Sequence, residues 1–429
     1  MNLDFSPMKP LKSQRWLYVV GAVAIAAGLV GFFAFQRHRA ATFAETVSKA
    51  ISEHRFDDAR KAIQELFQLK PRSAQAEYLL ALLELKLDRP MECLEAIKLA
   101  GEWGYSKGEL AILAAILGVR GGQLQNAENV LRPALELNSE PRAEIAEAMT
   151  RIFLSSYRLK EADLAIERWI NAAPDDARPY VYRDQILQRL ESDPAEMIRN
   201  LRIALELDPT LDKPRLALAE LLLSTHVNDE SEIEFESYLS RNLDSAPAHA
   251  GLGQIASLKG DLVKAVSEFE AVLKLDPNNL IALQQLSLID LRANNAESAC
   301  TRLKKALESF PFDVNLHYNY ATALRLAGNK TQADQETAIT NKLREELDAV
   351  TELRKELLMH PDDYDRKADV MKWLIEHGQE KEGLKWSELI LKKKPNHGKT
   401  CEILAQYYER IGQSGLANYY RTLAPTSAH

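Results

Sequence analysis

The sequence predicts an all-α fold, in which a solenoid of stacked helical hairpins follows one transmembrane helix. Two observations lead to this prediction. A run of twenty uncharged residues lies near the N-terminus, and a helical pattern returns about every 34 residues through the rest of the chain. No linker rich in Gly, Ser or Pro separates subdomains, so we expect one continuous array of repeats.

The composition excludes several classes of protein. With 54 basic and 62 acidic side chains, the 429 residues carry a net charge of −8. This charge argues against general nucleic-acid binding, which needs a concentrated basic surface. The three cysteines, Cys93, Cys300 and Cys401, are too few and too scattered for a disulfide scaffold or a zinc knuckle.

The N-terminal apolar run predicts a membrane anchor. Trp16–Phe35 would form a helix of about 30 Å, the thickness of the hydrocarbon core of a bilayer. The alternatives are a cleaved signal peptide and a buried core helix. A signal peptide is disfavoured because its apolar region usually spans about 7–15 residues and leads to a small-residue cleavage site. We therefore expect a tail at residues 1–15 and an uncleaved transmembrane helix at residues 16–35.

The charges that flank this run favour one orientation. Lys9, Lys12 and Arg15 precede the run, whereas Arg37 and Arg39 follow it. Basic residues are enriched on the cytoplasmic side of a membrane. We expect a short cytoplasmic tail with the large body translocated, and a body that faces the cytoplasm is the alternative.

The clearest repeat unit is Ala246–Asn279. It contains Leu252-Gly253, Ala265, Phe269 and Pro277. We expect Gly253 to permit close approach of the paired helix, Ala265 to lie where the two helices cross, and Phe269 to fill the space between them. Pro277 lacks an N–H group and ends the second helix.

The same register extends over most of the chain and predicts eleven helical pairs. Their expected starts are Ala40, Ala74, Gly108, Ala143, Arg178, Asp212, Ala246, Leu280, Val314, Tyr364 and Gly398. The crossing positions are then Ala59, Cys93, Ala127, Ala162, Met197, Ser231, Ala265, Ala299, Ala333, Gly383 and Ala417. Prolines are expected to end six of the second helices: Pro71, Pro174, Pro209, Pro277, Pro311 and Pro395.

These spacings resemble the tetratricopeptide repeat (TPR) family, whose 34-residue helix–turn–helix unit carries an L-G…A-x3-F…P pattern. The resemblance covers about Ala40–Leu423, although the unit at Arg178–Leu211 matches poorly because Asp184-Gln185 replaces Leu-Gly. It implies a right-handed superhelix with a concave groove lined by the first helix of each pair. We expect one array at residues 40–358 with about nine pairs, then C-terminal pairs and a cap at residues 359–429.

One break interrupts the register. Val314 and Tyr364 are 50 residues apart, and the segment between them predicts a second helix extended over residues 331–358. Its apolar stripe consists of Ile339, Leu343, Leu347, Val350, Leu353 and Leu357. The extension either folds against the following repeat or across the groove, or it docks a partner or a second copy through Leu343, Leu347 and Val350.

The search for catalytic motifs predicts no enzyme. The sequence contains no H-E-x-x-H pair and no C-x-x-C. Gly398-Lys399-Thr400 resembles the end of a phosphate-binding loop, but Lys393 occupies the position of the first glycine. Cys93 is expected to be a packing thiol. We expect no cofactor, no metal, no nucleic acid and no small-molecule substrate.

The resemblance also indicates which residues face the groove. Chaperone-binding TPR proteins hold a carboxylate with Lys and Asn at the fifth and ninth positions of a first helix, and none of the pairs here matches. The inward positions include Tyr182, Arg189, Lys213, Gln254, Gln284, Tyr318 and Arg325. Their mixed polar and aromatic character suits an extended peptide or a partner helix.

Together these features predict a membrane-anchored scaffold that binds partner proteins in its groove. The architecture resembles bacterial envelope proteins with one N-terminal helix and a repeat body, which implies an inner-membrane location with the body facing the periplasm. The alternatives are an assembly factor or holdase for envelope proteins, of the kind used in translocation or cytochrome c maturation, and the regulatory subunit of an enzyme.

Overall fold

The computed structural model describes residues 38–39 and 41–424, in which the regular structure is entirely α-helical. The expected all-α repeat fold is therefore confirmed for this part of the chain. The predicted transmembrane helix, Trp16–Phe35, lies outside the described residues. Among the helices that are described, none combines the length and apolar character needed to cross a bilayer.

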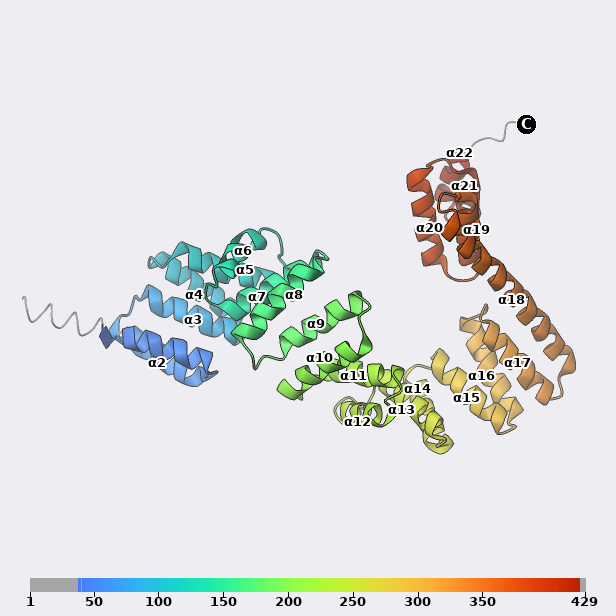
Figure 1. Cartoon of the computed structure of the whole chain (residues 1–429), viewed down its shortest axis with the longest axis horizontal. Helices are drawn as coiled ribbons and strands as arrows, with labels where there is room; N and C mark the ends of the chain where they lie inside the picture. Colours follow the sequence, from blue (N-terminus) through green and yellow to red (C-terminus); the bar gives the residue numbers. More distant parts are fainter. Residues whose placement is uncertain (1–37, 40, 425–429) are drawn as a thin grey trace, which may run out of the picture. The chain divides into compact units, whose positions relative to one another are not determined.

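The helices form two compact units, one that extends to Pro214 and one that begins at Arg215. In the first unit, helical residues 41–52 precede nine named helices (Figure 1). These are α2 (Phe56–Leu69), α3 (Ala74–Lys86), α4 (Pro90–Glu102), α5 (Lys107–Arg120), α6 (Ala127–Glu136), α7 (Arg142–Ser155), α8 (Leu159–Ala172), α9 (Arg178–Arg189) and α10 (Pro194–Leu207).

The helix α11 (Asp212–Ser224) begins just before this boundary, and eleven further helices complete the second unit. They are α12 (Asn228–Leu239), α13 (Ala246–Lys259), α14 (Leu262–Leu275), α15 (Leu280–Arg292), α16 (Ala296–Ser309), α17 (Val314–Leu326), α18 (Lys330–Met359), α19 (Tyr364–Glu376), α20 (Glu380–Lys393), α21 (Gly398–Arg410) and α22 (Ser414–Leu423).

The helix boundaries confirm the predicted register. From α3 onward, each first helix begins at its predicted residue, except α5 and α7, which begin one residue earlier. The six prolines that were expected to end second helices each lie two residues after the last helical residue, as Pro277 does after Leu275 of α14. Polar side chains start several helices; for example, Asn279 accepts a hydrogen bond from the backbone N–H of Ala282.

Small residues lie where the paired helices cross. All the predicted crossing residues are buried except Met197, which is half-buried. Two of the buried ones also bond the facing helix: Cys93 Sγ donates to Ala81 O at 3.2 Å, and Ser231 Oγ donates to Ala219 O at 2.8 Å. A polar group at this crowded position is therefore satisfied by the partner backbone.

The extended helix α18 folds against the following pair. Val350 and Leu357 of α18 form a buried cluster with Val370 and Leu374 of α19, and Trp386 of α20 packs against that cluster. The extension thus belongs to the same compact unit as α19 and α20. The two compact units divide between Pro214 and Arg215, whereas the sequence placed a boundary at residue 358.

Candidate functional site: an ionic hollow in the first unit

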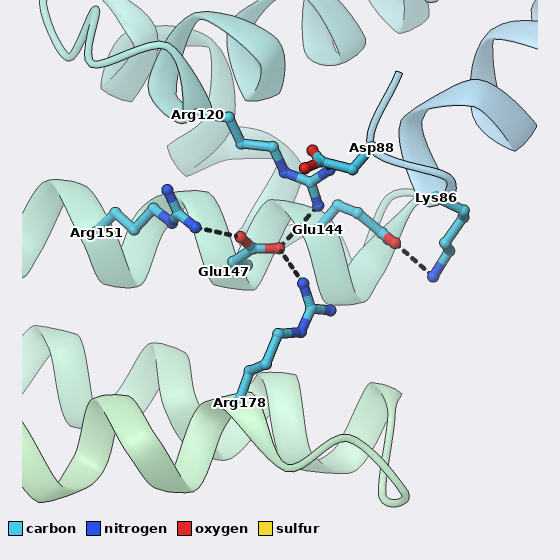
Figure 2. A pocket seen from close by; sticks show the side chains of 7 residues that line it. All are labelled: Lys86, Asp88, Arg120, Glu144, Glu147, Arg151 and Arg178. Carbon is cyan, nitrogen blue, oxygen red and sulfur yellow. Dashed lines mark hydrogen bonds and ion pairs between the residues drawn. The ribbon is translucent and has the colours of Figure 1, made fainter. Parts of the chain in front are cut away.

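A hollow of about 270 Å³ in the first unit is lined entirely by charged side chains (Figure 2). They are Lys86, Asp88, Arg120, Glu144, Glu147, Arg151 and Arg178. All come from the first helices α3, α5, α7 and α9, or from the turn that follows α3. The hollow therefore opens on the face that the first helices form.

Two glutamates of α7 form the floor of the hollow. The exposed fractions of Glu144 and Glu147 are only 3% and 2%. They lie three residues apart, and Arg151 follows four residues later, so one face of α7 presents all three side chains. A buried carboxylate is stable only when cations and hydrogen bonds compensate for its lost hydration.

That compensation comes from four cations. Glu147 contacts Arg120 at 2.9 Å, Arg151 at 3.0 Å and Arg178 at 3.3 Å. Glu144 pairs with Lys86. The cations are more exposed than the two glutamates, because their side chains retain between 16% and 50% of their accessible surface. The third acid, Asp88, lies 3.7 Å from Arg120 and is 87% exposed. A ligand that enters the hollow therefore meets these cations and Asp88 before it meets the glutamates.

Arg120 also joins neighbouring pairs of the array. Its Nη1 donates to Leu85 O at the end of α3 at 2.8 Å. The same contact recurs elsewhere, since Arg189 donates to Leu154 O at 2.9 Å and Arg410 to Ile375 O at 3.4 Å. Each arginine lies 35 residues after its acceptor. These bonds reach carbonyls in the last turn of a helix. Leu85 O also accepts from the Asp88 N–H at 3.4 Å, and Leu154 O from the Tyr157 N–H at 3.3 Å.

Arg178 is fixed on the other side of the hollow. It bonds Asp176, and its guanidinium carbon lies 5.2 Å from the ring centroid of Trp169. Trp169 Nε1 donates to Asp176 Oδ2 at 3.0 Å. Burial alone would lower the pKa of Arg178, but Asp176 and Glu147 outweigh this effect and raise the pKa above its usual value. Arg178 therefore stays charged.

Arg151 is the cation with the most unused hydrogen-bonding capacity in the hollow. Its bond to Glu147 leaves other guanidinium donors, and its buried Nε has no hydrogen-bond partner among the described residues. Its guanidinium carbon lies 5.7 Å from the ring centroid of Tyr182. Tyr182, a groove residue predicted from the sequence, is thus a neighbour of this hollow.

The other predicted groove residues do not line the hollow. Arg189 bonds Leu154 O, and its guanidinium lies over the ring of Tyr157 at 5.1 Å. Gln254 on α13 and Gln284 on α15 are half-buried, whereas Lys213 on α11 is exposed. On α17, Tyr318 is 58% exposed and Arg325 donates to Thr337 at 3.3 Å.

The three residues proposed for docking by the extension differ in exposure. Leu347 is 42% exposed, but Leu343 and Val350 are 8% and 3% exposed. Val350 is covered by Leu357, Val370 and Leu374 of the same chain. Leu343 and Val350 therefore offer no open surface to a partner in this structure, because the chain's own packing uses that part of the stripe.

Cys93, the thiol considered in the sequence analysis, is a buried packing residue in the structure. Burial raises the pKa of the Cys93 thiol to about 12, as expected for a packing residue. Within the described part of the chain, no group of His, Cys, Asp and Glu side chains is arranged to hold a metal ion.

The described part of the chain has the fold of helical-repeat proteins, which are built from stacked helical hairpins. Residues 49–92, which include α2 and α3, match the family model described as Tetratricopeptide repeat. Among solved structures, the chain is similar to YrrB, described as a TPR protein with an unusual peptide-binding site, at 22% identity and a TM-score of 0.38. That match covers 44% of this chain and 96% of YrrB.

Two further structures are similar over different shares of the chain. Yeast Tom70 matches at 15% identity with a TM-score of 0.33, over 90% of this chain and 92% of its own. MamA from Desulfovibrio magneticus matches at 18% identity with a TM-score of 0.36, over 39% of this chain and 94% of its own.

Proposed function

We propose that this protein is a membrane-anchored scaffold that binds an acidic segment of a partner protein in the ionic hollow of its first unit. The observation that carries the proposal is the arrangement of charge. Buried glutamates at the floor fix Arg120, Arg151 and Arg178, and these three cations, with the exposed Asp88 beside Arg120, stand between the floor and solvent. A preorganised cation loses little side-chain entropy when it binds.

The size of the hollow supports a side-chain ligand. Its volume of about 270 Å³ is below the range of about 300–1,000 Å³ in which small-molecule sites usually fall. An aspartate or glutamate side chain of the partner can pair with Arg151. Main-chain carbonyls of the same partner segment can then accept hydrogen bonds from the remaining N–H groups of the hollow's cations. Charge-assisted bonds of this kind are stronger than neutral ones.

The predicted membrane anchor sets the cellular location in which the scaffold would act. The uncharged run Trp16–Phe35 supports a single transmembrane helix, and the excess of basic residues before it supports a body on the far side of the membrane from the cytoplasm. We propose an inner-membrane protein of a bacterium whose repeats face the periplasm. Confinement to the membrane raises the effective concentration for partners held there. The proposal assigns a binding role and no catalytic activity.

The test is a mild-detergent pull-down of the full-length protein from native membranes, read by mass spectrometry. The wild type is compared with Arg151→Gln and with the control Arg142→Gln, which changes an arginine outside this hollow that pairs with Glu140. We expect one or two partners in near-equal amounts with the wild type and the control, and their loss with Arg151→Gln.

Two other results would change the proposal. Unchanged partners with Arg151→Gln would remove the hollow from the binding site. A long, substoichiometric set of unrelated envelope proteins would favour the assembly-factor or holdase function instead. Protease protection in intact cells and in spheroplasts tests the orientation, because a periplasmic body becomes accessible once the outer membrane is opened.

A further inference from the structure

The C-terminal half of α18 carries the residue signature of a second helix. Ala349 lies 15 residues before the start of α19, and Pro361 lies three residues before it. The crossing residue Ala265 and the terminal proline Pro277 lie at the same distances before the start of α15. The long helix α18 thus joins two second-helix segments, one with its crossing residue at Ala333 and one with it at Ala349.

The packing agrees with this assignment on the side that faces α19. Val350 and Leu357 follow Ala349 by one and eight residues, and both belong to a buried cluster with residues of α19. In α14, Val266 and Leu273 occupy the same positions after the crossing residue and pack against a cluster that includes residues of α15. The C-terminal half of α18 therefore meets the following first helix as an ordinary second helix does.

Within the described part of the chain, no first helix covers the other side of this segment. The crossing residues of the eleven pairs are buried or half-buried, but Ala349 is exposed. Glu345, Glu352 and Glu356 lie four, three and seven residues from Ala349, so they share its side of the helix, and they are exposed too. Residues 330–342, which the register would make the first helix of this unit, already form the N-terminal half of α18 and pair with α17.

The repeat register indicates which side chain belongs opposite Glu352. Three pairs have a glutamate three residues after the crossing residue, and it bonds the fourth residue of the first helix: Glu234 with Arg215, Glu268 with His249, and Glu336 with His317. The side chains of those glutamates are 19–23% exposed. Glu352 has the same position after Ala349, but its side chain is 66% exposed and contacts Lys355 of its own helix. A basic side chain from a covering helix would complete the pattern.

The charge of the uncovered face also selects a basic partner. The exposed acids around Ala349 are Glu345, Asp348, Glu352 and Glu356. The nearby cations Lys342 and Lys355 contact glutamates of α18 itself, and Glu356 pairs with Arg366. Glu345 and Asp348 form no ion pair with the residues that the structure describes. Ala349 itself is small, so the backbone of a second helix can approach closely at the centre of this acidic face.

We propose that the C-terminal half of α18 is a docking site for a basic amphipathic helix of a partner protein, which packs as the first helix of a pair that α18 completes. The partner helix lies antiparallel to α18, with small or apolar residues against Ala349 and Leu353 and an arginine or lysine against Glu352. Its expected length is that of the chain's own first helices, which have 12–14 residues in α9 and α13. This site and the ionic hollow take ligands of opposite charge.

The first test places the photo-crosslinking residue p-benzoylphenylalanine at position 349 or 351 of the full-length chain in native membranes. Thr351 is also exposed but lies about 200° around the helix from Ala349. Position 349 should crosslink to one segment of a partner, shown by mass spectrometry to carry arginine or lysine, and position 351 should not. Glu352→Arg should lower the yield at position 349 at least tenfold, whereas Arg151→Gln should leave it unchanged, because Arg151 belongs to the hollow of the first unit.

Several outcomes of the crosslinking would overturn the docking site. They are a crosslink from position 349 to the same chain or to a second copy, equal yields at positions 349 and 351, no crosslink at position 349, and a yield that Glu352→Arg does not change. Because Arg151→Gln acts on the ionic hollow alone, failure of the hollow and failure of the docking site give different results.

The second test uses a defined probe, a fluorescein-labelled peptide with the sequence of residues 245–260 and the change His249→Arg. This is the first helix that meets Ala265 and Glu268 in the chain itself, and a hydrocarbon staple keeps it helical, because short isolated helices are marginal in water. Fluorescence anisotropy would measure its binding to the full-length protein in detergent micelles. The same peptide with His249→Glu is the control probe and should not bind.

Variants of the protein locate the bound probe. Ala349→Leu should weaken binding at least tenfold by blocking close approach, and Glu352→Gln should weaken it several-fold. Thr351→Leu should bind like the wild type. All three changes are at exposed positions, so urea unfolding should match the wild type and separate a loss of binding from a loss of folding. Equal affinity of the wild type and Ala349→Leu, or no binding of the arginine probe, would refute the docking site.

Discussion

The ring of Phe235 occupies the space that a side chain at Gly251 would need. A Cβ atom built on Gly251 of α13 would lie 2.3 Å from Phe235 Cζ of α12. Phe235 is fully buried, so its ring has little room to move. Two residues along α13, Gly253 likewise leaves room for the ring of Phe269 of α14. A Cβ atom on Gly253 would lie 2.8 Å from the nearest carbon of that ring. The helix α13 thus packs against an aromatic ring from each neighbouring helix.

Gly251→Ala should destabilise the second unit. The added methyl group must displace the Phe235 ring or the helix, which costs about 1–3 kcal/mol in well-packed cores. Equilibrium urea unfolding would measure the loss. The control is Gly415→Ala in α22, where a Cβ meets no atom within 4 Å. That change should be neutral or stabilise by up to about 1 kcal/mol, because alanine favours helix.

Glu147→Gln should destabilise the first unit strongly. The glutamine retains the shape but leaves Arg120, Arg151 and Arg178 near one another without the shared carboxylate. Breaking a buried ion pair from one side typically costs about 3–5 kcal/mol. Glu53→Gln is the control, because Glu53 pairs with Arg55 at the surface and its side chain is 44% exposed. Its loss should be below about 1 kcal/mol in the same unfolding experiment.

Acid should weaken the first unit through Glu128. Hydrogen bonds from Arg158 and Arg132 lower the pKa of Glu128 from 4.5 to about 2. Because the folded-state pKa is depressed, this stabilisation is complete above about pH 4.5 and is lost as the pH falls toward 2. Unfolding free energies measured across this window should decline less steeply for Glu128→Gln than for the wild type. Glu136→Gln, an exposed change on the same helix, should retain the wild-type slope.

Two adjacent leucines test the packing of α18. Leu357 is 8% exposed and belongs to the cluster with Val370 and Leu374, whereas Leu358 is 81% exposed. Leu357→Ala should cost about 2–5 kcal/mol of unfolding free energy, as large-to-small changes in cores do. Leu358→Ala should stay within about 0.5 kcal/mol of the wild type. Equal losses would contradict the packing of α18 on α19.

The sequence predicted the repeat architecture well because its signals are local. Small residues such as Ala265, and prolines such as Pro277, recur at a fixed spacing that marks crossings and helix ends. Gly251 lies outside the L-G signature, and the demand for a glycine there becomes visible only when Phe235 is placed beside it. The division between Pro214 and Arg215 has no marker in the composition at all.

The ionic hollow was harder to predict for a physical reason. Arg120 and Arg178 reach Glu147 across 27 and 31 residues, from two other helical pairs. The sequence does not show whether a charged side chain will be buried or will lie at the surface. The signal that could have revealed the hollow is Glu144 and Glu147 among the apolar residues of α7, a first helix with most of its residues buried. For Tyr182 the sequence predicted only a groove-facing position, and its contact with Arg151 becomes visible in the structure alone.

The arginines that donate to a preceding helix end limit how far this array can be rearranged. Leu85 O, Leu154 O and Ile375 O each accept a hydrogen bond from an arginine of the next pair, and this bond is lost when the two pairs are separated. A hairpin excised, duplicated or moved to another position would either lose the arginine that donates to its helix end or carry an arginine without its acceptor. Modular engineering of this chain should therefore transfer each of these arginines together with the helix end that it serves, which keeps α3 with α5, α7 with α9 and α19 with α21.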